Sequence, residues 1–284
     1  MTNALASRPA SGASGPAAGF TKPIDAVMPA FDATEIPRQA SAEVERLFRK
    51  QRLAASYRLF GQAGFDMGGA GHITARDPEF PDQFWVNPAG VHFSRICVSD
   101  LMLVDHAGVI IEPPRKARAI LNRAAFAIHS ELHKARPDVV AAAHSHSIYG
   151  KAWSSLGRLL DPISQDAAAF YEDHGIFTDF SGVVMETSEG ERIGQALGSR
   201  SAVILQNHGI LTVGQSVEAA VWRYFALENA CQTQLLAEAA GTVKPMSEAI
   251  ARLTRSQIGS EVAALWAFNT YWDVVVEAEP DLLD

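Results

Sequence analysis

The sequence predicts an α/β fold, organised as a single domain over residues 41–284 behind a flexible tail at 1–40. Short apolar runs bounded by Gly, Pro, Asn and Asp alternate with longer segments whose apolar residues recur every three or four positions. Two apolar runs flank Asp105 to Gly108, a pattern typical of an antiparallel hairpin. No linker-like stretch follows residue 40, so we expect one domain.

The bulk composition excludes several functional classes. The 284 residues carry a formal net charge of −8, which disfavours nucleic acid or an anionic membrane as a partner. No apolar run approaches the roughly 18 residues of a membrane span, and the N-terminus lacks the apolar core of a secretory signal. Cys97 and Cys231 lie far apart in apolar surroundings and are read as buried, reduced thiols. We therefore expect a cytoplasmic protein.

The first half of the chain combines one helix with short strands. The tail is rich in Ala, Ser, Gly and Pro and has almost no periodicity. A helical pattern begins at Ser41 and stops before Gly61. The predicted strands are 72–76, 84–86, 101–104 and 109–111.

The second half alternates helices with more apolar strands. A helix is expected over 117–135, and the apolar run from Val139 to His144 reads as a buried strand. Ser188 and Glu191 fit a capping box for a helix that ends at Leu197. The other expected elements are a short strand at 182–185, a strand at 202–206, a helix at 217–235 and helical segments between 246 and 276.

Three histidines form a candidate metal site. His144 and His146 follow an apolar strand, and side chains two apart on a strand point to the same face. His208 ends a second apolar run. Neutral imidazoles bind zinc, iron or manganese at roughly 2.0 to 2.2 Å, and catalytic sites typically keep three protein ligands and one open position. We expect a divalent cation, zinc first, with Fe(II) or Mn as alternatives.

The other histidines compete less well for this role. His129 and His133 lie four apart on the 117–135 helix, but the intervening Glu131 does not directly follow the first histidine as in the metalloprotease motif. They are read as structural or solvated. His92 and His106 lie in loop-like contexts and are given no site role.

Four segments together resemble the class II aldolase/adducin superfamily. They are 136–147 with His144 and His146, 202–214 with Asn-His-Gly, 71–76 and 87–91. The similarity covers roughly residues 42 to 245. It implies a three-layer α/β/α domain with a central, largely antiparallel sheet, and a metal held by the three histidines. It also implies a homotetramer with sites at subunit contacts.

The chain departs from the family pattern at three positions. Ala125 stands where the sugar-phosphate aldolases carry a catalytic glutamate, and Glu131 lies too far along the helix to replace it. Ala89 replaces a serine that helps to hold a substrate phosphate, and His72 replaces an asparagine. The resemblance is therefore to a divergent member that lacks the aldolase acid/base group.

The remaining chemistry needs other side chains. Tyr171 and His174 are the predicted catalytic proton donors or acceptors, with Gln165 as a positioning amide. Arg76 is expected to pair with a substrate carboxylate, His72 with another substrate atom, and Tyr149 to line the cavity.

The predicted function is that of a metal-dependent carbon–carbon lyase acting on a non-phosphorylated, carboxylated small molecule. Decarboxylation and retro-aldol cleavage both leave an enolate that a Lewis acid stabilises. The first alternative, drawn from the family resemblance, is a non-haem Fe(II) oxygenase that oxidatively decarboxylates aryl 2-oxo acids. The second is a non-catalytic, adducin-like assembly module, which the intact ligand set disfavours.

Overall fold

A computed structural model describes residues 39–183 and 187–284 of the chain, and a single sheet organises them. Its eight strands lie in the order β4-β3-β2-β1-β5-β8-β7-β6, and all neighbours are antiparallel except β6 and β7. The strands are β1 (His72–Arg76), β2 (Gln83–Val86), β3 (Met102–Asp105), β4 (Ile110–Glu112), β5 (Ala141–Ser145), β6 (His174–Phe177), β7 (Ala202–Leu205) and β8 (Gly209–Gly214). The predicted, largely antiparallel sheet is confirmed.

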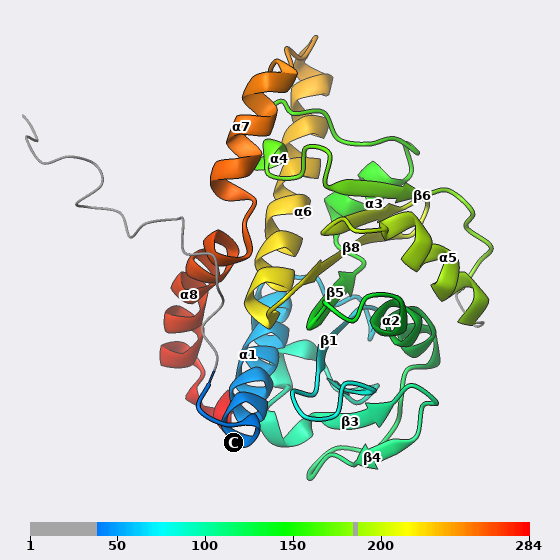
Figure 1. Ribbon diagram of the computed structural model, residues 1–284, viewed down its shortest axis with the longest axis vertical. Coiled ribbons are helices and arrows are strands. Elements are labelled where there is room, and N and C mark those ends of the chain that lie inside the picture. Colours follow the sequence, from blue (N-terminus) through cyan, green and yellow to red (C-terminus); the bar gives the residue numbers. More distant parts are fainter. Residues whose placement is uncertain (1–38, 184–186) are drawn as a thin grey trace, which may run out of the picture. The chain divides into compact units, whose positions relative to one another are not determined.

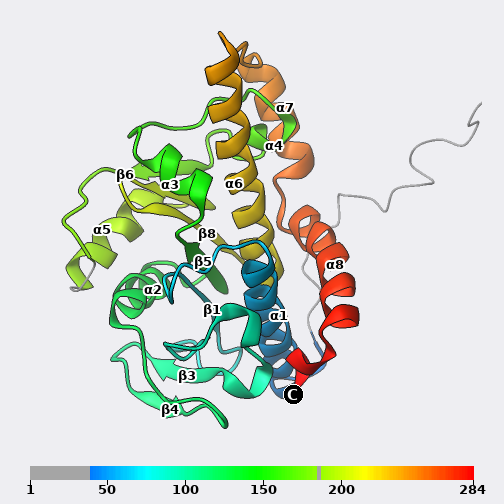
Figure 2. The same cartoon turned by 180° about the vertical axis from the view of Figure 1, so that it is seen from behind.

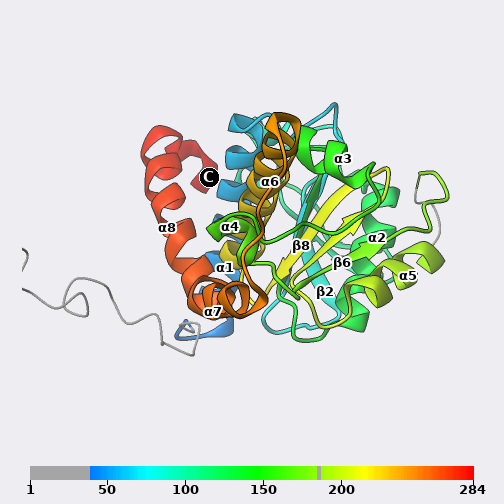
Figure 3. The same cartoon turned by 90° about the horizontal axis from the view of Figure 1, so that it is seen from above.

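Helices cover both faces of this sheet (Figure 1). One face carries α1 (Ala42–Gln62), α6 (Val217–Ala240) and α8 (Glu261–Ala278), and the other carries α2 (Arg123–Ala135) and α5 (Thr187–Leu197). The view from above shows the strands between these two groups (Figure 3). The shorter helices are α3 (Ile148–Ser154), α4 (Gln165–Ala168) and α7 (Glu248–Ile258). The structure therefore has the predicted α/β/α layers.

Strand alternation separates the two cores. Ala141 and Ala143 of β5 join the cluster formed with α1 and α6, whereas Ala142 joins the cluster formed with α2 and α5. Because successive side chains point to opposite faces, His144 lies on the same face as Ala142, beneath α2 and α5. Figure 2 shows β5 between β1 and β8 from the other side, with α2 and α6 on opposite flanks.

Two helix boundaries differ from the sequence prediction for physical reasons. The first helix is expected to begin at Ser41 and to stop before Gly61. It begins at Ala42, with Ser41 as its N-cap, and continues through Gly61 to Gln62. The expected 117–135 helix begins only at Arg123. Its N-cap is Asn122, whose side-chain oxygen accepts the backbone N–H groups of two residues in the first turn. The apolar residues before the cap follow helical spacing without being helical.

The second half shows further differences. Ser188 lies inside α5 instead of capping it, because that helix already begins at Thr187. The helical region predicted after residue 246 is two helices, interrupted at Gly259, with Ser260 capping the second. Half of the strand expected at 182–185 lies outside the described residues, and 182–183 form a bend.

Two bulk predictions can also be compared with the structure. Cys97 and Cys231 are both buried and free, as predicted. Among the described residues, no helix combines the length and the apolar character that a bilayer span requires.

Candidate metal centre

His144 is held at the middle of the sheet, and one of its ring nitrogens has no hydrogen-bond partner. It pairs in register with His72 of β1 on one side and with Leu211 of β8 on the other. Its Nδ1 lies 2.8 Å from the carbonyl oxygen of Ile210, so Nδ1 carries the proton and donates it to that oxygen. Its Nε2 is buried and has no hydrogen-bond partner. A backbone carbonyl that fixes the tautomer in this way is typical of a metal-binding histidine.

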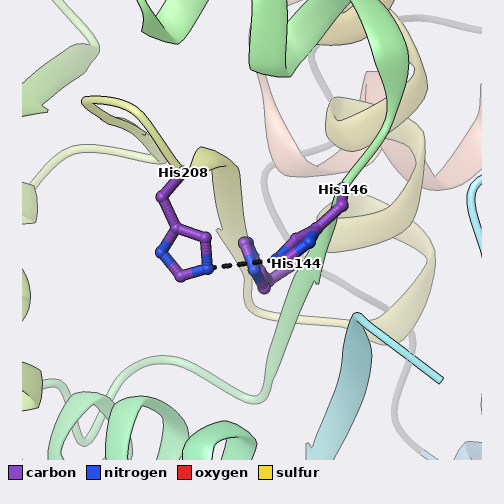
Figure 4. A group of neighbouring side chains, drawn as sticks. All are labelled: His144, His146 and His208. Carbon is purple, nitrogen blue, oxygen red and sulfur yellow. Dashed lines mark hydrogen bonds between the residues drawn. The ribbon is translucent and has the colours of Figure 1, made fainter. Parts of the chain in front are cut away.

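His146 and His208 bring two more imidazoles to the same place. His146 lies one residue beyond β5, and His208 lies in the turn between β7 and β8, where its N–H donates to Leu205 O over 2.9 Å. The turn needs Asn207 in the left-handed region at φ 59°, a conformation that asparagine tolerates well. Figure 4 shows the three rings converging from the β5 end and this turn.

The geometry of the three rings fits one cation. Their candidate ligand atoms all lie within 4.8 Å of one another, and the Nε2 atoms of His146 and His208 are 3.1 Å apart. Two nitrogens bound to one cation at about 2.1 Å lie roughly 3.0 to 3.5 Å apart. Burial, and then the His146 ring, lower the pKa of His208 to about 4. The neutral imidazole that a metal requires is therefore the favoured form at pH 7.

Gly71 allows β1 to approach the ligand strand. Its φ of +95° lies in the region that favours glycine. A Cβ at this position would lie 3.0 Å from the backbone oxygen of His144 and 3.0 Å from Ser145 Cα. Gly71 thus has a packing role beside the candidate site.

A buried glutamate anchors the segment that follows His146. Glu228 of α6 accepts the Ser147 hydroxyl at 2.5 Å and the Gly150 N–H at 2.6 Å through Oε2, and the Tyr149 N–H at 2.8 Å through Oε1. The carboxylate therefore caps the N-terminus of α3, which begins two residues after His146. Sequence reasoning missed this residue, because nothing local in α6 indicates which distant backbone groups it will meet.

The substrate-binding candidates lie in different settings. His72 is buried beside the cluster, with its ring centroid 5.4 Å from that of His144. Tyr149 lies on α3, half-buried, three residues past the metal-ligand candidate His146. Arg76 is buried and donates to the backbone oxygens of four residues, which favours a structural role: Val139, Pro81, His133 and Arg136.

The predicted catalytic group of Tyr171, His174 and Gln165 lies away from the histidine cluster. His174 opens β6 and pairs with Ala202 at the start of β7, whereas His208 follows the other end of β7. Its Nδ1 donates to Phe170 O at 2.7 Å, and its Nε2 accepts the Leu160 N–H at 2.9 Å.

The other two members of this group contact solvent. Tyr171 is half-buried, with the Arg252 guanidinium 5.7 Å from its ring centroid. Gln165 is exposed at the start of α4. The structure does not bring these three side chains to the histidine cluster within one chain, so their catalytic roles stay predictions.

The pair His129 and His133 is closer to the cluster than the sequence suggested. Both are buried on α2 and bracket Thr74 of β1, whose Oγ1 lies 2.6 Å from His129 Nδ1 and 2.9 Å from His133 Nε2. The solvated alternative for these two histidines is therefore wrong. The ring centroid of His129 lies 4.1 Å from that of His72.

These buried histidines predict an acid-sensitive fold. Burial lowers the pKa of His129 and His133 well below the ordinary value, and the neighbouring His133 and Arg76, respectively, lower it further. The unfolded chain, with histidine pKa values near about 6.5, binds protons first as the pH falls. The free energy of unfolding should therefore decrease as the pH is lowered below about 6.5.

Urea unfolding of the chelator-treated protein at several pH values between about 7.5 and 5.5 measures this dependence. The double variant His129→Gln/His133→Gln removes both titrating rings and should give a flatter profile. An identical slope in wild type and double variant would contradict the assignment.

The comparisons with known proteins agree with one another on the family. Residues 51–235 match the family model described as class II aldolase and adducin N-terminal domain. A protein of Streptomyces roseochromogenus subsp. oscitans named 4-hydroxy-3-prenylphenylpyruvate oxygenase/4-hydroxy-3-prenylbenzoate synthase is 42% identical over 238 residues, covering 84% of this chain and 85% of that protein. Decarboxylase NovR of Streptomyces niveus is 41% identical, over 84% of this chain and 87% of that protein.

A solved structure is similar along most of the chain. The structure titled L-fuculose 1-phosphate aldolase from Glaciozyma antarctica PI12 superposes with a TM-score of 0.82 at 43% identity, covering 88% of this chain and 97% of that one. The names of these three relatives thus span aldolase, decarboxylase and oxygenase.

Proposed function

Because the chain belongs to the class II aldolase and adducin family, we propose that it is a metal-dependent decarboxylase of a non-phosphorylated, carboxylated small molecule. The observation that carries the proposal is the cluster of His144, His146 and His208, combined with alanine at position 125. Of two relatives more than 40% identical, one is named a decarboxylase and the other a prenylphenylpyruvate oxygenase/prenylbenzoate synthase. The histidine cluster would supply the Lewis acid that this reaction needs.

The three imidazoles would hold the cation, and each has a reason to stay neutral and oriented. His144 is oriented by Ile210 O, and His146 and His208 are positioned by the start of α3 and by the β7–β8 turn. When bound, a divalent cation supplies a Lewis acid toward substrate oxygens. The uncharged ligands leave its positive charge uncompensated, which favours an anionic substrate such as a carboxylate.

Two replacements argue against a sugar-phosphate substrate. Ala125 is buried in the first turn of α2 and offers no carboxylate for acid/base work. Ala89 offers no hydroxyl, and its N–H donates to Ile120 O at 2.8 Å, so this amide is already engaged. These two positions support a substrate without phosphate.

A second candidate is oxidative decarboxylation of an aryl 2-oxo acid with Fe(II) and dioxygen. The word oxygenase in the printed name of one relative favours it. A set of neutral imidazoles also suits Fe(II) as well as zinc. Both candidates release CO₂, and they differ in metal and in the need for oxygen.

We also propose a homotetramer with the site at a subunit contact. Family membership supports it, and so does the side chain of Ile148, which is 67% exposed only two residues from His146. An apolar side chain of this size on the rim of a site suits burial by a second copy.

A single experiment separates the candidates. Protein purified without oxygen is analysed for zinc, manganese and iron. It is then incubated, with and without air, with an aryl 3-oxo acid, whose decarboxylation leaves an enolate, and with 4-hydroxyphenylpyruvate, while CO₂ and oxygen are measured. The proposal expects metal-dependent CO₂ release from the 3-oxo acid, above the uncatalysed rate and without oxygen consumption. CO₂ release that requires iron and consumes oxygen supports the second candidate. Absence of both metal and CO₂ release would sink both and favour an assembly module.

A further inference from the structure

Two buried imidazole nitrogens lie beside the metal cluster without a hydrogen-bond partner. They are Nε2 of His72 and Nε2 of His129, and neither has a donor or acceptor among the described residues. Their ring centroids are 4.1 Å apart, and that of His72 is 5.4 Å from that of His144. Leaving a buried polar atom unpaired is costly, so such atoms beside a candidate site indicate a missing ligand.

A chain of hydrogen bonds sets the tautomer of His129. The guanidinium of Arg76 can only donate, so His133 Nδ1, which lies 3.3 Å from Arg76 Nη2, acts as the acceptor. His133 then carries its proton on Nε2 and donates it to Thr74 Oγ1 over 2.9 Å. The Thr74 hydroxyl donates in turn to His129 Nδ1 over 2.6 Å. The remaining proton of neutral His129 is therefore on Nε2, the unpaired atom.

Strand register places this N–H on the same side of the sheet as the metal cluster. Thr74 and His72 are two residues apart on β1 and share a face, and His72 pairs with His144 on β5. That face is the one covered by α2, which carries His129. Ala125 lies one turn before His129, so the two share a helix face. The position at which the related aldolases carry a carboxylate is thus the apolar Ala125. One turn further along the same helix face, His129 presents an N–H group.

We propose that His129 contacts the substrate, donating its Nε2–H to an anionic oxygen of a carboxylated molecule bound beside the three metal ligands. Thr74 and His133 are positioning residues that hold the ring in the donating tautomer. The inference rests on the proposed function and deepens it, because it assigns the group that recognises the carboxylate. Arg76, which the sequence assigned to that task, instead orients the donor through His133.

The donor is neutral rather than cationic. Burial, followed by the nearby His133 and His144 rings, holds the pKa of His129 well below its ordinary value. A neutral imidazole that donates a hydrogen bond polarises a substrate oxygen without adding a buried charge next to a bound cation.

Binding to the zinc-loaded protein under nitrogen tests the proposal, with phenylpyruvate as the probe and calorimetry as the readout. His129→Phe keeps a ring but no polar atom and should weaken binding about 10- to 100-fold, the loss expected for a hydrogen bond to a charged group. Thr74→Val should weaken it about 10-fold, and Thr74→Ser should restore it. Ser130→Ala, the neighbouring buried hydroxyl on α2, is the matched control and should bind like wild type. Equal binding by wild type and His129→Phe would overturn the inference.

A second readout does not depend on the substrate. Nitrogen-15 NMR of the side chains in the metal-free protein should show His129 protonated on Nε2 in wild type and in Thr74→Ser, with loss of that single tautomer in Thr74→Val. A His129 ring protonated on Nδ1 in wild type overturns the proposal. If wild type binds no phenylpyruvate, the proposed substrate class fails, while the tautomer result still decides whether the donor is present.

Discussion

His144→Ala should remove both metal binding and the proposed decarboxylase activity. His144 Nε2 is buried and unpaired, and no other described side chain completes the cluster of His146 and His208 with a third ligand. Removing a group that only orients a ligand already costs about 10- to 100-fold in metal affinity, so loss of the ligand itself should cost at least about 100-fold. Metal content after dialysis and CO₂ release from an aryl 3-oxo acid measure the two effects.

The control for this variant is His92→Ala, which removes an exposed histidine on the protein surface. It should keep full metal content and activity. The two variants must also be compared by circular dichroism, because His144 contributes the hydrogen bond to Ile210. A folded His144→Ala protein that retains one metal ion per chain would refute the assignment.

Glu228→Leu should destabilise the fold more than any surface change. Its carboxylate accepts hydrogen bonds from Ser147, Tyr149 and Gly150. The two backbone N–H groups would become unpaired, whereas the Ser147 hydroxyl would keep its contact with the Tyr224 hydroxyl at 2.9 Å. Stranding buried donors costs about 1–3 kcal/mol each, and breaking a buried charged network about 3–5 kcal/mol, so we expect a loss of about 3–5 kcal/mol in the free energy of unfolding. Urea unfolding of the metal-free protein measures it.

Glu228→Gln distinguishes loss of the cap from loss of charge. The amide oxygen of glutamine can still accept, while its NH₂ group meets backbone donors, so an intermediate loss is expected. Glu191→Gln, at an exposed position of α5, should change stability by less than about 0.5 kcal/mol. Metal affinity should fall in Glu228→Leu as well, because α3 begins two residues after His146. Unchanged stability and unchanged metal affinity in Glu228→Leu would contradict this role.

Many strands and helices could be predicted from the sequence because each is determined by the pattern of apolar and turn residues within its own segment. The strand at 72–76 and the apolar strands before His144 and His208 follow from short apolar runs with turn residues at their ends. The three-layer arrangement came from the resemblance of the motifs around them. The three candidate ligands were found because each lies at the end of an apolar run, which is a local property.

What sequence reasoning could not provide is register between distant segments. His129 and Thr74 are 55 residues apart and meet only because α2 crosses β1, so a pair on one helix was read as structural or solvated. Glu228 meets the start of α3 across 78 residues in the same way. The late start of α2 has a different cause. Asn122 competes for the first backbone donors, and this capping interaction overrides the apolar spacing before it.

The spacing of the three histidines means that a bound cation would cross-link two distant parts of the chain. His146 and His208 lie 62 positions apart (208 − 146), and everything from α3 to β7 lies between them. A cation bound to both histidines would close this segment into a loop, as a disulfide does. A covalent cross-link that closes a loop of that length stabilises the folded state by on the order of 4 kcal/mol. Only molecules in which His146 and His208 lie close together could bind the cation with both histidines. Metal occupancy would then report on whether the whole segment from α3 to β7 is folded. Hydrogen exchange of β6, β7 and α5 would slow together when the cation binds.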